Sequence, residues 1–237
     1  MLIPNPCALR LRPLNIFLNA TDVYRQQIMA KNDTFLNYIP NEICLDMRSD
    51  KLSGFFPLLQ SGFKMKAEVG CNLKTFLCSG LGMTPNYIEE KINTIILDGK
   101  AVDDPDSAIL NDGSILALSA AMPGLVGATL RRGGYLAPLR SQITYRQADG
   151  LSQPGKGMIS LKLFNTLIKD LGTVLLKIGV YLSGDELSDI LDGFSRELWV
   201  GCKGATVNDR PVDLNKLLGM TCLDESSLIE LRVQFGG

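Results

Sequence analysis

The sequence predicts an α+β fold, in which helices and strands follow one another without a regular alternation. Three observations predict it. Thr84 and Pro85 have the start chemistry of a helix, an N-cap side chain followed by proline in the first turn. An apolar strand pattern runs into Asp98-Gly99, and another strand pattern follows the turn at 111–113. Both turns contain glycine, which readily takes positive φ, so we expect strands on either side of them.

The N-terminal segment has its own pattern. Residues 7–18 alternate apolar and polar side chains over part of their length, which predicts a half-buried strand interrupted by a proline. Thr21 or Asp22 can cap a helix that ends before Pro40. We therefore expect residues 1–50 to form a strand and helix extension.

The next segment, 51–137, is predicted to be a domain. Residues 55–60 and 63–69 have strand patterns separated by Ser61-Gly62, and we expect them to form a hairpin. Asn72 then heads a segment with apolar residues at helical spacing. The expected order is hairpin, helix, strand, short turn and strand.

The second half begins with a change of composition. Residues 138–157 are rich in Arg, Gln, Ser, Gly and Pro, which predicts a linker or exposed loop. Residues 159–178 place apolar side chains on a helical stripe, and Ser183 with Glu186 has the sequence of a capping box. The C-terminal domain, 158–237, is predicted to be helical plus β. Its strand patterns lie at 198–202, 205–207 and 228–233.

Charge and composition exclude several classes of partner and catalytic site. The formal net charge of -1 gives no broad electropositive surface, so neither nucleic acid nor an anionic membrane is an expected partner. The chain contains no histidine, which excludes Ser-His, Cys-His and zinc-histidine sites. We expect a non-enzymatic protein without catalytic residues, cofactor or metal, whose partner is another protein.

Cysteine usage and the N-terminus predict a cytoplasmic protein. The cysteines have no paired Cys-x-x-Cys spacing, so free thiols in a reducing compartment are expected. The first residues lack a signal-peptide pattern. The uncharged run at 113–130 approaches the length of a membrane span, but it contains Pro123 and three glycines, so we expect no span.

Four segments of the middle domain occur in a familiar order. They are Leu73-Lys-Thr-Phe-Leu, Tyr87-Ile-Glu-Glu-Lys-Ile, Ile96-Leu-Asp-Gly-Lys-Ala-Val-Asp-Asp and Leu110-Asn-Asp-Gly-Ser-Ile-Leu-Ala-Leu. Together they resemble the bacterial sulfur-carrier proteins of thiamine and molybdopterin synthesis, which are ubiquitin-like β-grasp domains. The resemblance is strongest over residues 63–122 and covers about a quarter of the chain. It implies a β-grasp domain within 51–137.

The resemblance also implies a chemistry. In that family an adenylating enzyme activates the carboxylate of a flexible Gly-Gly tail, which then becomes a thiocarboxylate. The chain ends in Gly236-Gly237, which the resemblance assigns as the carrier tail. Gly133-Gly134 is internal and is better interpreted as a surface turn. An uninformative tail is the alternative interpretation of Gly236-Gly237.

The second half of the chain echoes the first. Thr206-Val-Asn-Asp-Arg-Pro-Val-Asp followed by the segment 223–231 resembles residues 95–103 followed by 110–118. A tandem duplication of the β-grasp unit would explain the echo. The echo lacks both Asp-Gly turns, and the helical stretch at 159–191 is longer than a minimal β-grasp unit contains, so a different C-terminal domain is the alternative.

Two functions follow from these patterns, and an enzyme that uses only carboxylates and lysines is a third alternative. The first is a ubiquitin-like carrier whose Gly237 is activated by an adenylating, E1-like enzyme. The second is a β-grasp binding or scaffold module that presents a sheet face or edge strand to a protein partner, without covalent chemistry. A homo-oligomer is compatible with either function.

Overall fold

A computed structural model describes residues 41–146, 153–218 and 227–236. All of them belong to one compact unit, Ile39–Gly237. The strand and helix predicted before Pro40 lie outside the described residues.

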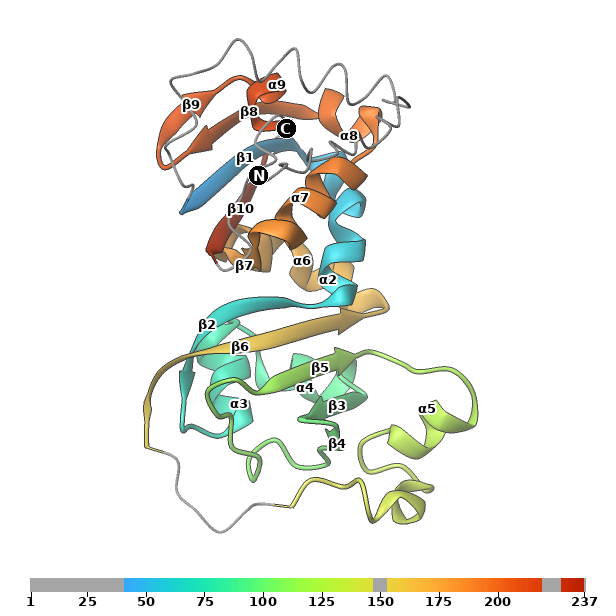
Figure 1. The fold of residues 1–237 in the computed structure, drawn as a ribbon. Helices are drawn as coiled ribbons and strands as arrows, with labels where there is room; N and C mark the ends of the chain where they lie inside the picture. Colours follow the sequence, from blue (N-terminus) through green and yellow to red (C-terminus); the bar gives the residue numbers. More distant parts are fainter. Residues whose placement is uncertain (1–40, 147–152, 219–226, 237) are drawn as a thin grey trace, which may run out of the picture. The chain divides into compact units, whose positions relative to one another are not determined.

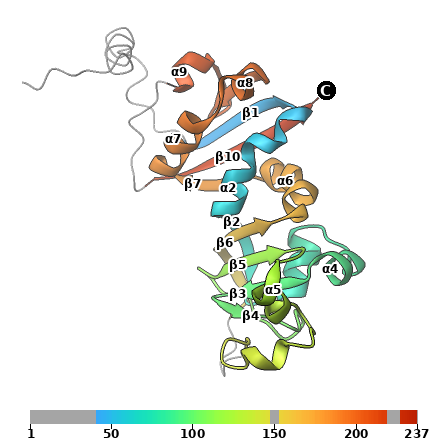
Figure 2. The same cartoon turned by 90° about the vertical axis from the view of Figure 1, so that its right-hand side faces the viewer.

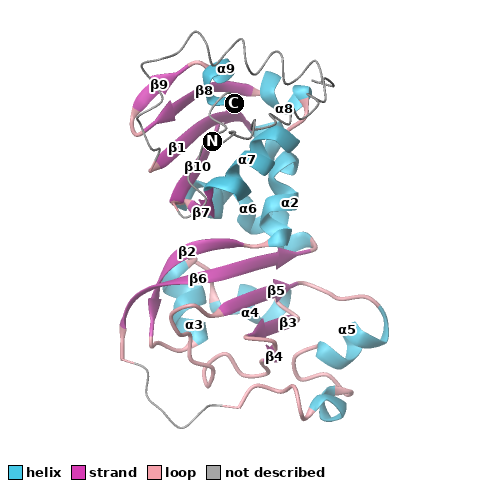
Figure 3. Cartoon of the chain, viewed as in Figure 1, coloured by secondary structure: helices cyan, strands magenta, loops and turns pink. Residues whose placement is uncertain are grey.

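Within the described residues the strands form a single mixed sheet (Figures 1 and 3). The strands are β1 (Glu42–Arg48), β2 (Phe63–Val69), β3 (Thr94–Leu97), β4 (Lys100–Ala101), β5 (Ile115–Ser119), β6 (Gly155–Phe164), β7 (Val180–Ser183), β8 (Cys202–Val207), β9 (Arg210–Val212) and β10 (Leu228–Gly236). Their order in the sheet is β4-β3-β5-β6-β2-β7-β10-β1-β8-β9.

Helices lie between the strands. They are η1 (Ser49–Phe55), α2 (Phe56–Ser61), α3 (Leu73–Thr75), η2 (Phe76–Gly80), α4 (Pro85–Lys91), α5 (Gly124–Leu130), η3 (Ala137–Arg140), α6 (Thr166–Ile178), α7 (Gly184–Gly193), α8 (Arg196–Val200) and α9 (Leu214–Leu218). The prediction of a mixed helix and strand fold is confirmed.

The sheet consists of two half-sheets with the same pattern of strand directions. In the first half-sheet, β4-β3-β5-β6-β2, the parallel pair β5 and β6 is flanked by antiparallel neighbours. In the second, β7-β10-β1-β8-β9, the parallel pair is β1 and β10. Among the described residues, the two half-sheets are joined at one ladder pair, Lys64 and Tyr181.

The half-sheets differ in how the chain supplies their strands. The first is continuous in sequence, from β2 to β6. The second takes its central strand, β1, from before the first half-sheet, while β7 to β10 all come after it. The backbone N–H groups of Asn41 and Glu42 donate to Asn208 Oδ1, each at 2.9 Å, and fix the start of β1 beside the β8–β9 turn.

The core lies on one face of the sheet. Buried residues alternate with more exposed ones along β1, β2 and β10, as in a sheet with one covered face. Helix α6 buries Leu167, Leu171 and Leu175 and lies beside β10 (Figure 2). Phe55 of η1, which is 0% exposed, meets the Phe194 ring at 5.1 Å and the Phe235 ring at 5.9 Å, edge to face.

Local signals in the sequence predict several element ends correctly. Thr84 Oγ1 accepts a hydrogen bond from Tyr87 N at 3.2 Å, and Ser183 and Glu186 form the predicted capping box. Asp98 and Gly99 have φ of 51° and 77° in the turn between β3 and β4. These interactions span a few residues, so the sequence alone determines them.

Three predicted elements are wrong. Residues 55–60 do not pair with β2 as a hairpin but form the end of η1 and α2, because Phe55, Leu58 and Leu59 are buried at helical rather than alternating spacing. Residues 198–200 end helix α8, which Ser195 caps, instead of forming a strand. The start of the helical stripe predicted at 159–178 belongs to β6, which pairs with β2.

The predicted domain boundaries can be compared with the strands. The segment 1–50 contains β1, and the segment 138–157 contains the beginning of β6. Within residues 41–146, 153–218 and 227–236 no helix has the length and apolar character needed to cross a membrane. The uncharged run at 113–130 forms β5 and α5 instead.

The central position of β1 leads to a first prediction. Leu45 is 0% exposed and lies between β10 and β8. Leu45→Ala should lower the free energy of unfolding by about 2–5 kcal/mol, because it leaves a cavity in a packed core. Urea denaturation followed by fluorescence measures this change. Trp199 is the only tryptophan of the chain and packs on Phe194, so its emission reports on the second half-sheet.

Asp46→Ala is the matched control, because Asp46 is the exposed neighbour on the same strand. It should change stability by about 0.5 kcal/mol or less. Equal destabilisation by the two variants would contradict the central position of β1.

Candidate functional site

A groove of about 720 Å³ lies in the first half-sheet. Its floor is formed by residues 66–68 of β2 and 156–158 of β6, which pair with each other in an antiparallel ladder. Its wall is formed by Cys71 and by the side of α3 and η2 that carries Thr75 and Phe76. The volume is within the range of small-ligand and side-chain pockets.

Small residues leave the space for this groove. Ala67 lies opposite Gly157 in the ladder. A Cβ atom at Gly157 would lie 2.7 Å from Asp112 Oδ1 and 2.9 Å from Val69 Cγ1, so a side chain does not fit there without movement. A Cβ atom at Gly80, on the opposite wall, would lie 3.0 Å from Phe76 Cδ2. Small residues thus occur both in the floor and in the wall of the groove.

The wall helix changes its winding at the groove. Asn72 caps α3, with its Oδ1 accepting from Thr75 N at 2.8 Å. Residues 76–80 then form a π-helical turn, in which Leu81 N donates to Phe76 O at 3.2 Å. Such turns are rare and frequently lie at functional sites. Buried Phe76 and Leu77 anchor the turn in the core.

One edge of β2 borders the groove without a partner strand. On the side away from β6, β2 pairs with β7 through Lys64 alone among the described residues. Beyond Lys64, the backbone of residues 66–68 reaches the groove with that edge uncovered by any described strand. An uncovered strand edge offers N–H and C=O groups that another chain can pair with.

The charged groups of the groove have both signs. Glu68 and Lys156 lie opposite each other across the β2–β6 ladder. The Lys66 ammonium lies 4.8 Å from the centre of the Tyr181 ring, a cation–π contact that reaches from β2 to β7. The groove therefore has no strong net field and is suited to a partner with an apolar segment and few charges.

Cys71 is the one thiol in the lining of the groove. Burial raises the pKa of the Cys71 thiol, and the Glu68 carboxylate raises it further. The thiol also donates to Glu68 O at 3.3 Å. A raised pKa lowers the fraction of reactive thiolate, so these surroundings do not activate Cys71 as a nucleophile.

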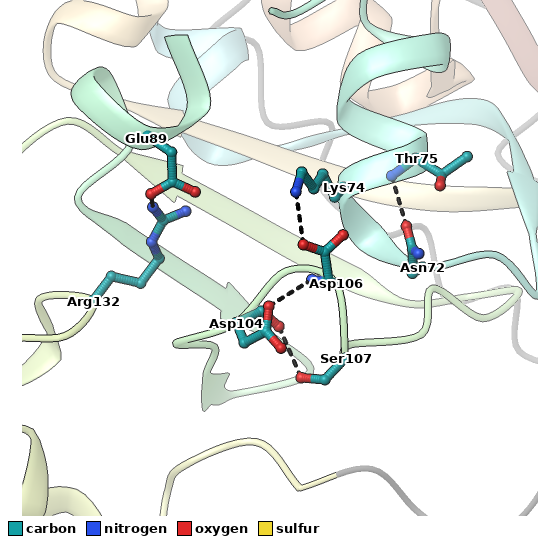
Figure 4. Close-up of polar contacts among 8 residues, drawn as sticks. All are labelled: Asn72, Lys74, Thr75, Glu89, Asp104, Asp106, Ser107 and Arg132. Atoms are coloured by element: carbon teal, nitrogen blue, oxygen red, sulfur yellow. Dashed lines mark hydrogen bonds and ion pairs between the residues drawn. The ribbon is translucent and has the colours of Figure 1, made fainter. Parts of the chain in front are cut away.

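Acidic residues near one end of the domain have specific partners (Figure 4). Glu89 Oε2 lies 2.7 Å from Arg132 Nη2, and Asp106 Oδ2 lies 2.7 Å from Lys74 Nζ. Asp104 accepts hydrogen bonds from within its own loop. Glu89 and Asp106 are thus used in contacts between elements, and the described residues include no group of three or more His, Cys, Asp or Glu side chains that could hold a metal.

The predicted carrier tail is only partly described. Gly236 is the last residue of β10 and pairs with Arg48 in the parallel ladder. Gly237 lies outside the described residues. Gly133, the first of the internal glycine pair, has φ of 57° in a turn, and its N–H donates to Asp103 Oδ1 at 3.0 Å.

The groove could not be predicted from the sequence. Its small lining residues, Ala67, Gly80 and Gly157, are far apart in the chain. It also borders a strand edge that has no partner strand among the described residues. The only local signal is the helix cap at Asn72.

Comparison of the chain with protein-family models, with curated proteins and with solved structures gave no match. The resemblance to sulfur carriers therefore stays a prediction from the sequence.

The raised pKa of Cys71 leads to a second prediction. Because only the thiolate reacts with iodoacetamide, alkylation of Cys71 should reach its half-maximal rate at a higher pH than alkylation of free cysteine. Mass spectrometry of the peptide that contains Cys71 measures the rate. The same chain unfolded in urea serves as the control and should react as free cysteine does. A half-maximal rate at or below the pH of free cysteine would indicate an activated thiolate.

Proposed function

We propose that the chain is a protein-binding module of two β-grasp-like half-sheets, and that it binds an extended segment of a partner protein along the free edge of β2. The edge of β2 carries the proposal. It is uncovered beyond Lys64 in the described part of the chain, and it borders the groove of about 720 Å³. An extended segment can add a strand to such an edge, with backbone hydrogen bonds for affinity and pockets for alternate side chains.

The strand pattern supports the β-grasp part of the proposal. In a β-grasp sheet a central parallel pair has antiparallel neighbours, and the sheet packs on a helix. Both half-sheets have this pattern, although β1 replaces a strand of the second one. The β8–β9 turn also matches the β3–β4 turn, because Asn208 and Asp209 have φ of 47° and 63° where Asp98 and Gly99 have 51° and 77°. This agreement favours a duplication in which the strands were rearranged.

The groove favours a partner with an apolar residue. A segment paired with β2 places every second side chain toward the wall helix. There it would meet Ala67 and Phe76. Cys71 and Thr75 add weak polar contacts at the rim. The module would thus select for an extended segment with one large apolar side chain near the position of Ala67.

The geometry supports this function better than the carrier function. A carrier tail must enter the site of its activating enzyme as free backbone, whereas Gly236 is paired with Arg48 inside the sheet. Activation of Gly237 by an adenylating enzyme would therefore require this end of β10 to leave its ladder. The binding function requires no such change.

A groove-filling variant tests the proposal. Peptides that bind the chain are first selected from a displayed random library, and their affinity is measured by fluorescence anisotropy. Ala67→Trp should weaken binding about tenfold or more, because the indole occupies the space of the apolar anchor. In hydrogen exchange, bound peptide should protect amides within residues 66–69.

Two controls make the result specific. Asp189→Trp adds the same side chain to an exposed position of α7 and should leave the affinity unchanged. Removal of Gly236 and Gly237 should also leave peptide binding unchanged. Selected peptides that bind the Ala67→Trp variant as tightly as the original chain, or that protect amides only elsewhere, would show that the edge of β2 is not the binding site.

A further inference from the structure

A second, smaller pocket lies on the opposite edge of the first half-sheet. It has a volume of about 250 Å³ and is lined by Lys100 of β4 together with Ser141, Gln142, Thr144 and Arg146. Every lining residue is polar, two of them are cationic, and none is acidic. This pocket shares no residue with the groove beside β2.

Backbone hydrogen bonds hold the two sides of this pocket together. Ala101 N donates to Ile143 O at 2.8 Å, and Tyr145 N donates to Ala101 O at 2.8 Å. They form a parallel bridge between Ala101 and Thr144. The bridge places Lys100 beside residues 141–146, which come much later in the chain. The pocket is thus part of the folded sheet edge and does not depend on a free loop.

The buried Arg140 connects Thr144 of the pocket lining to Asp103. Arg140 is 3% exposed, and its Nη2 lies 2.6 Å from Asp103 Oδ1. Its Nε donates to Thr129 O at 2.8 Å, and its Nη1 donates to Thr144 Oγ1 at 3.0 Å. Asp103 therefore pairs with Arg140 and does not compete with a bound anion for the cations of the pocket.

The two cations of the pocket have no acceptor among the described residues. Neither Lys100 nor Arg146 forms an ion pair or side-chain hydrogen bond within the described part of the chain. A guanidinium offers parallel N–H donors that match the oxygens of a phosphate, and an ammonium adds a compact positive charge. Ser141 and Gln142 add hydroxyl and amide donors.

We propose that this pocket is a binding site for a phosphate group, either as free orthophosphate or as the phosphate monoester of a small molecule. Arg146 and Lys100 pair with the phosphate oxygens, and Ser141 and Gln142 complete their hydrogen bonds. The proposal does not depend on the peptide-binding function.

The test uses the full chain labelled with ¹⁵N and titrated with sodium orthophosphate at constant ionic strength. Amide shifts of Lys100 and residues 141–146 should move and saturate. The double variant Lys100→Gln, Arg146→Gln should weaken binding about tenfold or more, because two charge-assisted contacts are lost. A parallel titration with phosphoserine identifies the source. Tighter binding of phosphoserine indicates a monoester ligand, and equal or weaker binding indicates free phosphate.

The control variant Lys91→Gln, Arg131→Gln removes the same charge from exposed positions outside the pocket and should bind as the original chain does. The amide spectrum of each variant reports directly whether it is folded. Shifts that do not saturate, or that are the same in both double variants, would overturn the proposal, because they indicate general attraction of anions.

Discussion

The contact between β2 and β7 determines much of the rest of the structure. It consists of one ladder pair, Lys64 and Tyr181, among the described residues. Polar side chains extend this contact across the sheet: Tyr181 Oη donates to Glu230 Oε2 at 2.5 Å, and Arg232 lies between Glu230 and Glu42 at 2.6 and 3.2 Å. Burial and this hydrogen bond raise the pKa of Tyr181, so the phenol keeps its proton and remains a donor.

Because that contact is short, the rest of the β2 edge has no partner strand among the described residues. If β7 followed β2 over its full length, the backbone of residues 66–68 would be covered and the groove would lose its open side. Instead the sheet continues through one pair, and its remaining edge at β2 meets a hollow made by Ala67 and Gly157. The opposite edge, at β4, is covered by the bridge from Ala101 to Thr144, and the cationic pocket lies there. Both proposed sites are thus consequences of how strand edges are closed.

Helix caps and tight turns could be predicted from the sequence, because they depend on residues that are close in the chain. The caps at Thr84 and Ser183 and the turn at Asp98-Gly99 are fixed by contacts within four residues, and all of them are correct. Pairing between distant strands leaves no such local signal. Residues 55–60 and 63–69 were expected to pair because they are adjacent, yet the partner of β2 is β6. The groove depends on the β2–β6 ladder, and the cationic pocket depends on the bridge between Ala101 and Thr144. Both pairings join distant parts of the chain, so neither site could be predicted.

The route of the chain through the second half-sheet has a consequence for biosynthesis. β1 leaves the ribosome before any other described strand, yet both of its neighbours, β8 and β10, are made last. The first half-sheet, from β2 to β6, has all its strands much earlier and can close while β1 is still unpaired. During that interval Ile43, Leu45 and Met47 are exposed on a strand with two open edges, a form that aggregates readily. The second half-sheet of such a chain can be completed only after its last strand has been made.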